Sequence, residues 1–161
     1  MKLAKTIRFD KSDLNVFESA SDEGEWAISG AFEFSEDTNA SLSSKRRQAF
    51  SNGFLGLATY GRATLVSISQ LTLNDKDSLV TNLAEFFVDK YGAPNIKAAK
   101  PVAEEEIDFM INLCTEHEIG TLLTVNRTME NDGIHEKFRH LPKNDACSNQ
   151  QIWATVADDW F

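Results

Sequence analysis

The stretch TLLTVNRTMENDGIHEKFRHL, residues 121–141, holds two β-type segments on either side of a strong turn signal. Asn131, Asp132 and Gly133 form the kind of triplet that reverses the chain between two paired strands. We therefore expect residues 121–129 to form a strand and residues 134–141 to return beside it. This hairpin indicates an antiparallel sheet.

Three further strands are expected before this hairpin. Residues 2–9 alternate apolar and polar side chains, which predicts a strand exposed on one face. In residues 26–34 the alternation places Trp26, Ile28, Phe32 and Phe34 on one face. Residues 63–72 are apolar on both faces, which indicates a central strand.

Helical spacing predicts three helices. The first spans residues 45–52. The second, capped by Asn74 or Asp75, runs to Tyr91 and ends at Gly92. The third opens at Pro101, places glutamates in its first turns and stops near Gly120.

The expected order is β-β-α-β-α-α-β-β, with hairpins at both ends and no repeating βαβ unit. This order predicts an α+β fold, a mainly antiparallel sheet of about five strands with two to three helices packed on one face. The 161 residues fit one domain, residues 1–161, with a polar C-terminal extension from about residue 142.

Charge and composition exclude several classes of function. The net charge is −9, from 25 acidic and 16 basic residues, and the one dense basic cluster is Lys45-Arg46-Arg47. Such a chain repels nucleic acid and acidic membranes. No apolar run approaches the roughly 20 residues of a membrane helix, and the N-terminus lacks the apolar core of a signal peptide. We expect a cytoplasmic protein whose Cys114 and Cys147 stay reduced.

Residues 51–68, SNGFLGLATYGRATLVSI, raise the question of a phosphate loop. A phosphate loop runs from strand to helix, whereas the order here is helix, loop, strand. Gly53 or Gly56 is better explained as a left-handed residue ending the helix, and Gly61 as a turn residue. Arg62, with nearby backbone N–H groups, remains a candidate for holding a carboxylate.

Metal and catalytic sites have weak support in the sequence. Cys114 and His117 have C-x-x-H spacing, with His135, His140 and Cys147 downstream. Zinc needs four converging ligands, and Cys114 falls on the apolar face of its helix, so we expect no metal and no cofactor. His117 lies between two glutamates, and such neighbours can tune a histidine for acid–base catalysis. A helix end of this kind is more often a solvated terminus.

The chain end WATVADDWF carries heavy aromatic side chains: Trp153, Trp160 and Phe161. They either pack on the protein's own sheet or dock on a partner subunit, since tryptophan is enriched at interface hot spots. We treat them as candidate interface residues.

Five segments together resemble a known family: TIRFDKSDLNVFE (6–18), GEWAISGAFEF (24–34), RQAFSNGFLGL (47–57), FVDKYGAP (87–94) and EEEIDFMINLC (104–114). They are similar to short, acidic hypothetical proteins typical of alphaproteobacteria, classed as a domain of unknown function. The resemblance covers roughly residues 3–140. It implies a bacterial, cytoplasmic, single-domain protein and supplies no catalytic residues.

Two hypotheses about function follow. The preferred one is a non-catalytic interaction or accessory protein that self-associates or binds a protein partner. It rests on the acidic surface, the aromatic chain end and the lack of a convincing catalytic set. The alternative is a small-ligand (anion) binding protein or enzyme with a pocket near residues 53–62, using Arg62, Tyr60 and His117.

Overall fold

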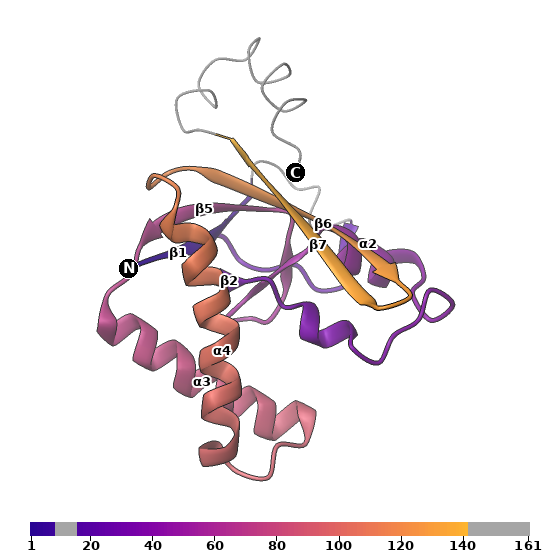
Figure 1. Ribbon diagram of the computed structural model, residues 1–161, viewed down its shortest axis with the longest axis horizontal. Helices are drawn as coiled ribbons and strands as arrows, with labels where there is room; N and C mark the ends of the chain where they lie inside the picture. Colours follow the sequence, from indigo (N-terminus) through magenta and orange to yellow (C-terminus); the bar gives the residue numbers. More distant parts are fainter. Residues whose placement is uncertain (9–15, 142–161) are drawn as a thin grey trace.

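The computed structural model describes residues 1–8 and 16–141 and shows an α+β fold (Figure 1). Its elements, in chain order, are β1 (Lys2–Ile7), β2 (Trp26–Ile28), the 3-10 helix η1 (Ala31–Phe34), α2 (Ser44–Asn52), β3 (Phe54–Gly56), β4 (Arg62–Ala63), β5 (Leu65–Gln70), α3 (Leu73–Tyr91), α4 (Ile96–Thr115), β6 (Leu122–Glu130) and β7 (Gly133–Leu141).

Seven strands form one curled sheet in the order β4-β3-β2-β1-β5-β6-β7. Each neighbouring pair is antiparallel, as the hairpin signal predicted. The sheet has more strands than the five expected, because β3 and β4 come from the segment interpreted as a loop. The β6–β7 hairpin closes with the pair Glu130 and Gly133, at the predicted turn.

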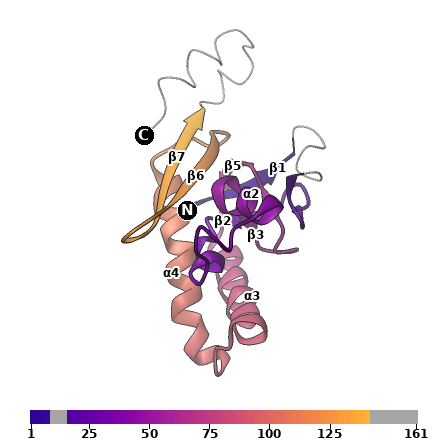
Figure 2. The same cartoon turned by 90° about the vertical axis from the view of Figure 1, so that its right-hand side faces the viewer.

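Helices α3 and α4 pack against each other and project together from one side of the sheet (Figure 2). Helix α4 lies against β1 and β2, and α2 packs against β6. The core between these layers contains fully buried aliphatic side chains, among them Leu3, Ile28, Leu55, Ile68, Leu83 and Ile107. Lys76 of α3 links the two long helices through an ion pair with Asp108, Nζ to Oδ1 2.9 Å.

The strand expected over residues 26–34 ends at Ile28 and is followed by η1. Gly30 causes the break, because it adopts a left-handed backbone with φ of 71°. A side chain there would also collide with Leu55, whose Cβ lies 2.5 Å from the position of a Gly30 Cβ. The turn brings the neighbouring carbonyl groups towards Arg62, as described below.

The prediction that Gly53 or Gly56 is a left-handed residue ending the helix is wrong. Gly53 is extended, with φ of −96°, and Gly56 lies within β3. No larger residue fits at these positions because other groups approach closely. A Cβ on Gly56 would lie 2.6 Å from a Glu25 carboxylate oxygen. A Cβ on Gly61 would lie 2.5 Å from the backbone of Ala20. The left-handed residue in this segment is Tyr60, with φ of 59°.

The helix boundaries also differ from the sequence analysis. Helix α3 is capped by Thr72, whose hydroxyl accepts a hydrogen bond from Asp75 N at 3.1 Å. Helix α4 begins at Ile96, because Asn95 caps it by accepting from Ala98 N at 2.8 Å. Pro101 therefore lies inside α4 and does not open it.

Candidate functional site

Helix α4 carries two stripes of different character. Its buried stripe packs into the core and contains Ala99, Ala103, Ile107, Met110, Ile111 and Cys114. On the outside, Val102 and Phe109 are large apolar side chains that remain 50% and 46% exposed. They are seven residues apart, about two helical turns, so they lie on one face. Exposed apolar side chains gathered on one face are typical of interaction surfaces.

An aromatic hollow of about 370 Å³ lies between η1, the end of α3 and the first half of α4. The ring of Phe32 contacts Phe87 and Tyr91 edge-to-face, with centroids 5.1 and 5.6 Å apart. Val102 and Glu106 complete the wall on the α4 side. Among the described residues that line this hollow, Glu106 is the only charged one.

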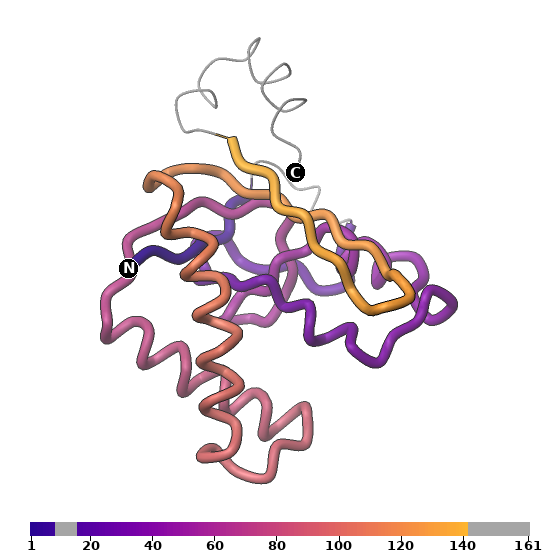
Figure 3. Tube along the Cα trace, viewed as in Figure 1, coloured from indigo at the N-terminus to yellow at the C-terminus, as the bar shows by residue number. Residues whose placement is uncertain are grey.

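Two more hollows continue along α4 towards its C-terminal end. The middle hollow, about 260 Å³, shares Phe32 and Glu106 with the first. The last, about 480 Å³, shares Phe109 and Glu136 with the middle one. The remaining residues of these two hollows are Ser29, Ala31, Glu105, Asn112, Leu113, Glu116 and Phe138. We call these three adjoining hollows, which share lining residues, the α4 groove; the segments that line it, η1, the end of α3, α4 and β7, can be followed in Figure 3.

The α4 groove is acidic as well as apolar. Four glutamates line it: Glu105, Glu106, Glu116 and Glu136. Its described lining contains no lysine, arginine or histidine. Burial, with the nearby carboxylates of Glu136 and Glu105, raises the pKa of Glu106 above its usual value. A cation in the groove would relieve this repulsion.

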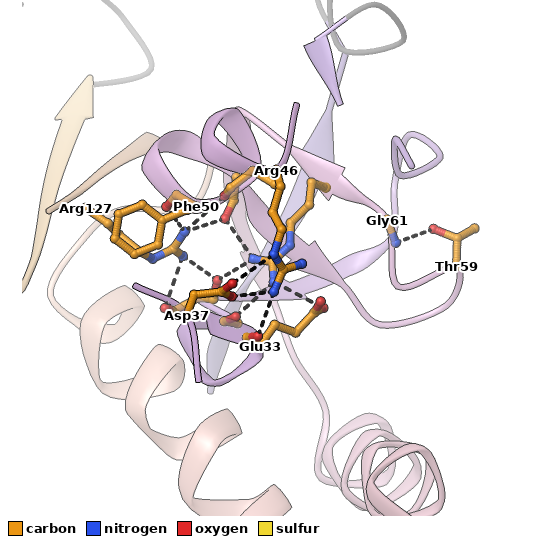
Figure 4. Close-up of polar contacts among 12 residues, drawn as sticks. Glu33, Asp37, Arg46, Phe50, Thr59, Gly61 and Arg127 are labelled. Carbon is orange, nitrogen blue, oxygen red and sulfur yellow. Dashed lines mark hydrogen bonds and ion pairs between the residues drawn. The ribbon is translucent and has the colours of Figure 1, made fainter. Parts of the chain in front are cut away.

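Arg127 of β6 has no exposed side-chain surface and is paired with Glu136, one of the residues that line the groove. Its Nη1 donates to the carbonyl oxygens of Phe50 and Gly53, at 2.9 and 2.8 Å (Figure 4). Its Nη2 donates to the carbonyl oxygen of Ser29. Its Nε donates to Glu136 Oε2 at 2.8 Å. These bonds tie β6 to the end of α2 and to the chain after β2, and they hold Glu136 in the groove wall.

Arg62 is the second buried arginine and lies close to the first. Its Nη1 donates to the carbonyls of Gly53 and Ser29, at 3.0 and 3.3 Å. Its Nη2 donates to Gly30 O at 2.9 Å and pairs with Glu33 at 3.1 Å. Burial lowers the pKa of Arg62 to about 10, Arg127 adds to this effect, and Glu33 opposes it. The contacts give Arg62 a structural role.

The predicted ligand residues are only partly brought together. Tyr60 and Arg62 both line a small hollow of about 100 Å³, and His117 is not among its lining residues. Tyr60 stacks on Phe86, with ring centroids 3.9 Å apart. His117 lies beside His140, at 4.7 Å between centroids, and burial, then His140, lowers its pKa. Ligand binding by these residues stays a prediction.

The candidate interface residues Trp153, Trp160 and Phe161, like Cys147, lie outside the described residues. Within residues 1–8 and 16–141, no three His, Cys, Asp or Glu side chains gather so that they could hold a metal ion. The same part of the chain contains no helix long and apolar enough to cross a membrane.

Sequence reasoning missed the α4 groove, although one signal for it was present. Val102 and Phe109 interrupt the polar side of α4 at a spacing of two turns, and Glu105 and Glu106 lie between them. The other wall comes from η1 and β7, which lie before and after α4 in the chain, η1 being more than 60 residues before it. Their approach to α4 depends on the tertiary fold.

The fold and the groove define an α+β protein with a curled antiparallel sheet and an open acidic, apolar groove. The chain matches the family of unknown function DUF6505 over residues 1–158, and it belongs to this family. The match is longer than the resemblance expected from the sequence. No curated protein and no solved structure matches the chain.

Proposed function

We propose that this protein is a non-catalytic interaction protein that binds a basic, apolar segment of a partner protein in the α4 groove. The observation that carries the proposal is the lining of the three adjoining hollows, which combines exposed aromatic surface with four carboxylates. Apolar and aromatic surface provides affinity in protein interfaces, and complementary charge provides specificity and speed of association.

The same charges argue against self-association through this groove. Two copies meeting face to face would bring two sets of Glu105, Glu106 and Glu116 together. Like charges across an interface disfavour the wrong partner strongly. A heterologous, cationic partner is therefore the better match.

Anion binding near residues 53–62 has less support. The Nη groups of Arg62 already donate to main-chain oxygens and to Glu33. The adjoining hollow, at about 100 Å³, is lined by Lys45 and Arg46 as well as Glu18 and Glu33, and Arg46 is already paired with Asp37. Carboxylates at this position would repel an anion.

The proposal is tested with labelled peptides and fluorescence anisotropy on the full chain. Peptides built from lysine, leucine and threonine are compared with versions in which glutamate replaces lysine. We expect only the lysine peptides to bind, and binding to weaken at high salt because screening reduces exposed charge interactions.

Variants of α4 locate the site. Glu105→Gln and Glu106→Gln are each expected to weaken binding about two- to fivefold, the range for exposed ion pairs. Glu104→Gln is the matched control, since Glu104 lies in the same helical turn, pairs with Lys76 and does not line the groove. Absence of binding by every lysine peptide, or equal weakening by the control, would contradict the proposal.

A further inference from the structure

Strand β7 is an edge strand of the sheet formed by residues 1–8 and 16–141. Within the described residues it pairs with β6 alone. The other edge strand, β4, has only 2 residues, whereas β7 has 9. A long edge strand offers a row of main-chain donors and acceptors to a further strand.

The hairpin register defines which backbone groups of β7 face this edge. The two-residue turn makes Glu130 and Gly133 a hydrogen-bonded pair. Hydrogen-bonded and non-hydrogen-bonded pairs alternate along an antiparallel ladder. The pairs Arg127–Glu136 and Val125–Phe138 are consequently non-hydrogen-bonded. The N–H and C=O groups of Glu136 and Phe138 therefore point away from β6.

These same two residues line the α4 groove with their side chains. Glu136 belongs to the middle and last hollows, and Phe138 belongs to the last. The open backbone edge and the acidic, apolar surface are thus adjacent. Along α4, the lining from Glu105 to Glu116 spans about 16 Å. A strand of five residues has about the same length.

Resting on the proposed function, we propose that the partner segment binds in an extended conformation and adds to the sheet as a strand beside β7. Main-chain bonds to Glu136 and Phe138 would supply affinity, and side chains at alternate positions would enter the groove. The inward positions favour lysine, arginine or large apolar residues because of the groove's carboxylates and rings.

The outward positions of this segment meet a different surface. Residues 135, 137 and 139 of β7 alternate with those in the groove, and Lys137 among them is basic. Cations at the outward positions would be repelled. The partner is therefore an extended peptide with cationic or apolar residues at every second position and neutral or acidic residues between them.

Two peptides of equal composition test the binding mode. One alternates inward lysine or leucine with threonine, and the other carries the same residues at helical spacing. We expect the alternating peptide to bind at least about tenfold more tightly to the full chain. Methylation of single peptide amides is expected to weaken it about tenfold at every second position, because those N–H groups reach β7.

Amide hydrogen exchange of the full chain provides a second readout. The amides of Glu136 and Phe138 are expected to exchange quickly in the free protein and to slow at least about tenfold with the alternating peptide bound. Slow exchange already in the free protein would show that the chain itself or a second copy covers the edge, which overturns the inference.

The two proposals fail in different ways. Tighter binding of the helical peptide, or tolerance of amide methylation at every position, would overturn strand addition and leave the groove as a binding site. Failure of both peptides to bind would overturn both the proposed function and the binding mode.

Discussion

Replacing Arg127 with methionine, a side chain of similar length, removes a fully buried guanidinium without opening a large cavity. The carbonyl oxygen of Phe50 loses its donor at 2.9 Å. The carboxylate of Glu136, whose side chain is only 17% exposed, loses its ion-pair partner at 2.8 Å. The carbonyls of Ser29 and Gly53 keep their bonds from Arg62.

The size of the effect follows from these contacts. A buried acceptor left without a donor costs about 1–3 kcal/mol. Leaving Glu136 unpaired adds about 1–2 kcal/mol, reduced from the value for a fully buried pair because water reaches the carboxylate. Burial disfavours the charge of Arg127 and lowers its pKa. Removing this buried charge therefore restores about 1 kcal/mol of the free energy of unfolding. We expect Arg127→Met to lower the free energy of unfolding by about 1–4 kcal/mol.

Urea denaturation followed by circular dichroism measures this change. The double variant Arg127→Met/Glu136→Gln should regain about 1 kcal/mol, since an amide tolerates the loss of the cation better than a carboxylate does. Arg47→Met, on the exposed side of α2, is the matched control and should change stability by less than about 0.5 kcal/mol. A loss below about 1 kcal/mol for Arg127→Met would refute the reasoning.

Three other predictions concern groups away from the groove. Burial alone would raise the pKa of Glu25, but hydrogen bonds from Thr59, Ala58 and Asp22 outweigh it and hold the pKa below its usual value. The stabilisation that ionised Glu25 provides is therefore present above the unfolded pKa and is lost as the pH falls through the folded pKa. Glu25→Gln should lower the free energy of unfolding by about 2 kcal/mol at pH 7 and by less in acid. Urea titrations at several pH values measure this difference. Gly61→Ala places a Cβ 2.5 Å from the backbone of Ala20 and should cost about 1–3 kcal/mol, whereas an unchanged melting temperature would contradict the close approach. Burial raises the pKa of Cys114 to about 12, so in a Cys147→Ser variant a thiol reagent at pH 8 should label the unfolded protein and leave the native protein unlabelled.

The elements that the sequence predicted well are those with a local signal. The turn at residues 131–133, the helix end at Gly92 and the position of Cys114 on the apolar face of α4 each depend on residues close together in the chain. Periodicity and turn chemistry are sufficient for such features. The class of fold and the antiparallel pairing follow from them.

The remaining differences come from contacts between distant residues. Gly30 could have continued a strand, but Leu55 and Arg62 approach it so closely that only glycine fits. Gly53 or Gly56 was interpreted as the left-handed end of a helix, yet Gly56 lies in β3, where a Cβ would come within 2.6 Å of a Glu25 carboxylate oxygen. One sequence carries no local mark of these approaches.

The candidate site was harder to predict for the same reason. Arg62 was singled out because it follows glycines, and its buried partners are carbonyl groups from residues 29, 30 and 53. The α4 groove needed η1 and β7 to be placed beside α4. Only the exposed Val102 and Phe109 pointed to it from within one helix.

Arg62 and Arg127 donate to the same two carbonyl oxygens, those of Ser29 and Gly53. A carbonyl oxygen has two lone pairs, so it accepts both bonds, and one arginine keeps it satisfied when the other is lost. Each arginine therefore partly compensates for loss of the other, and we expect the effects of the two substitutions on the free energy of unfolding to be non-additive. A chain in which Arg62 has been replaced is therefore expected to tolerate a substitution at Arg127 less well, so the effect of each change depends on whether the other is already present.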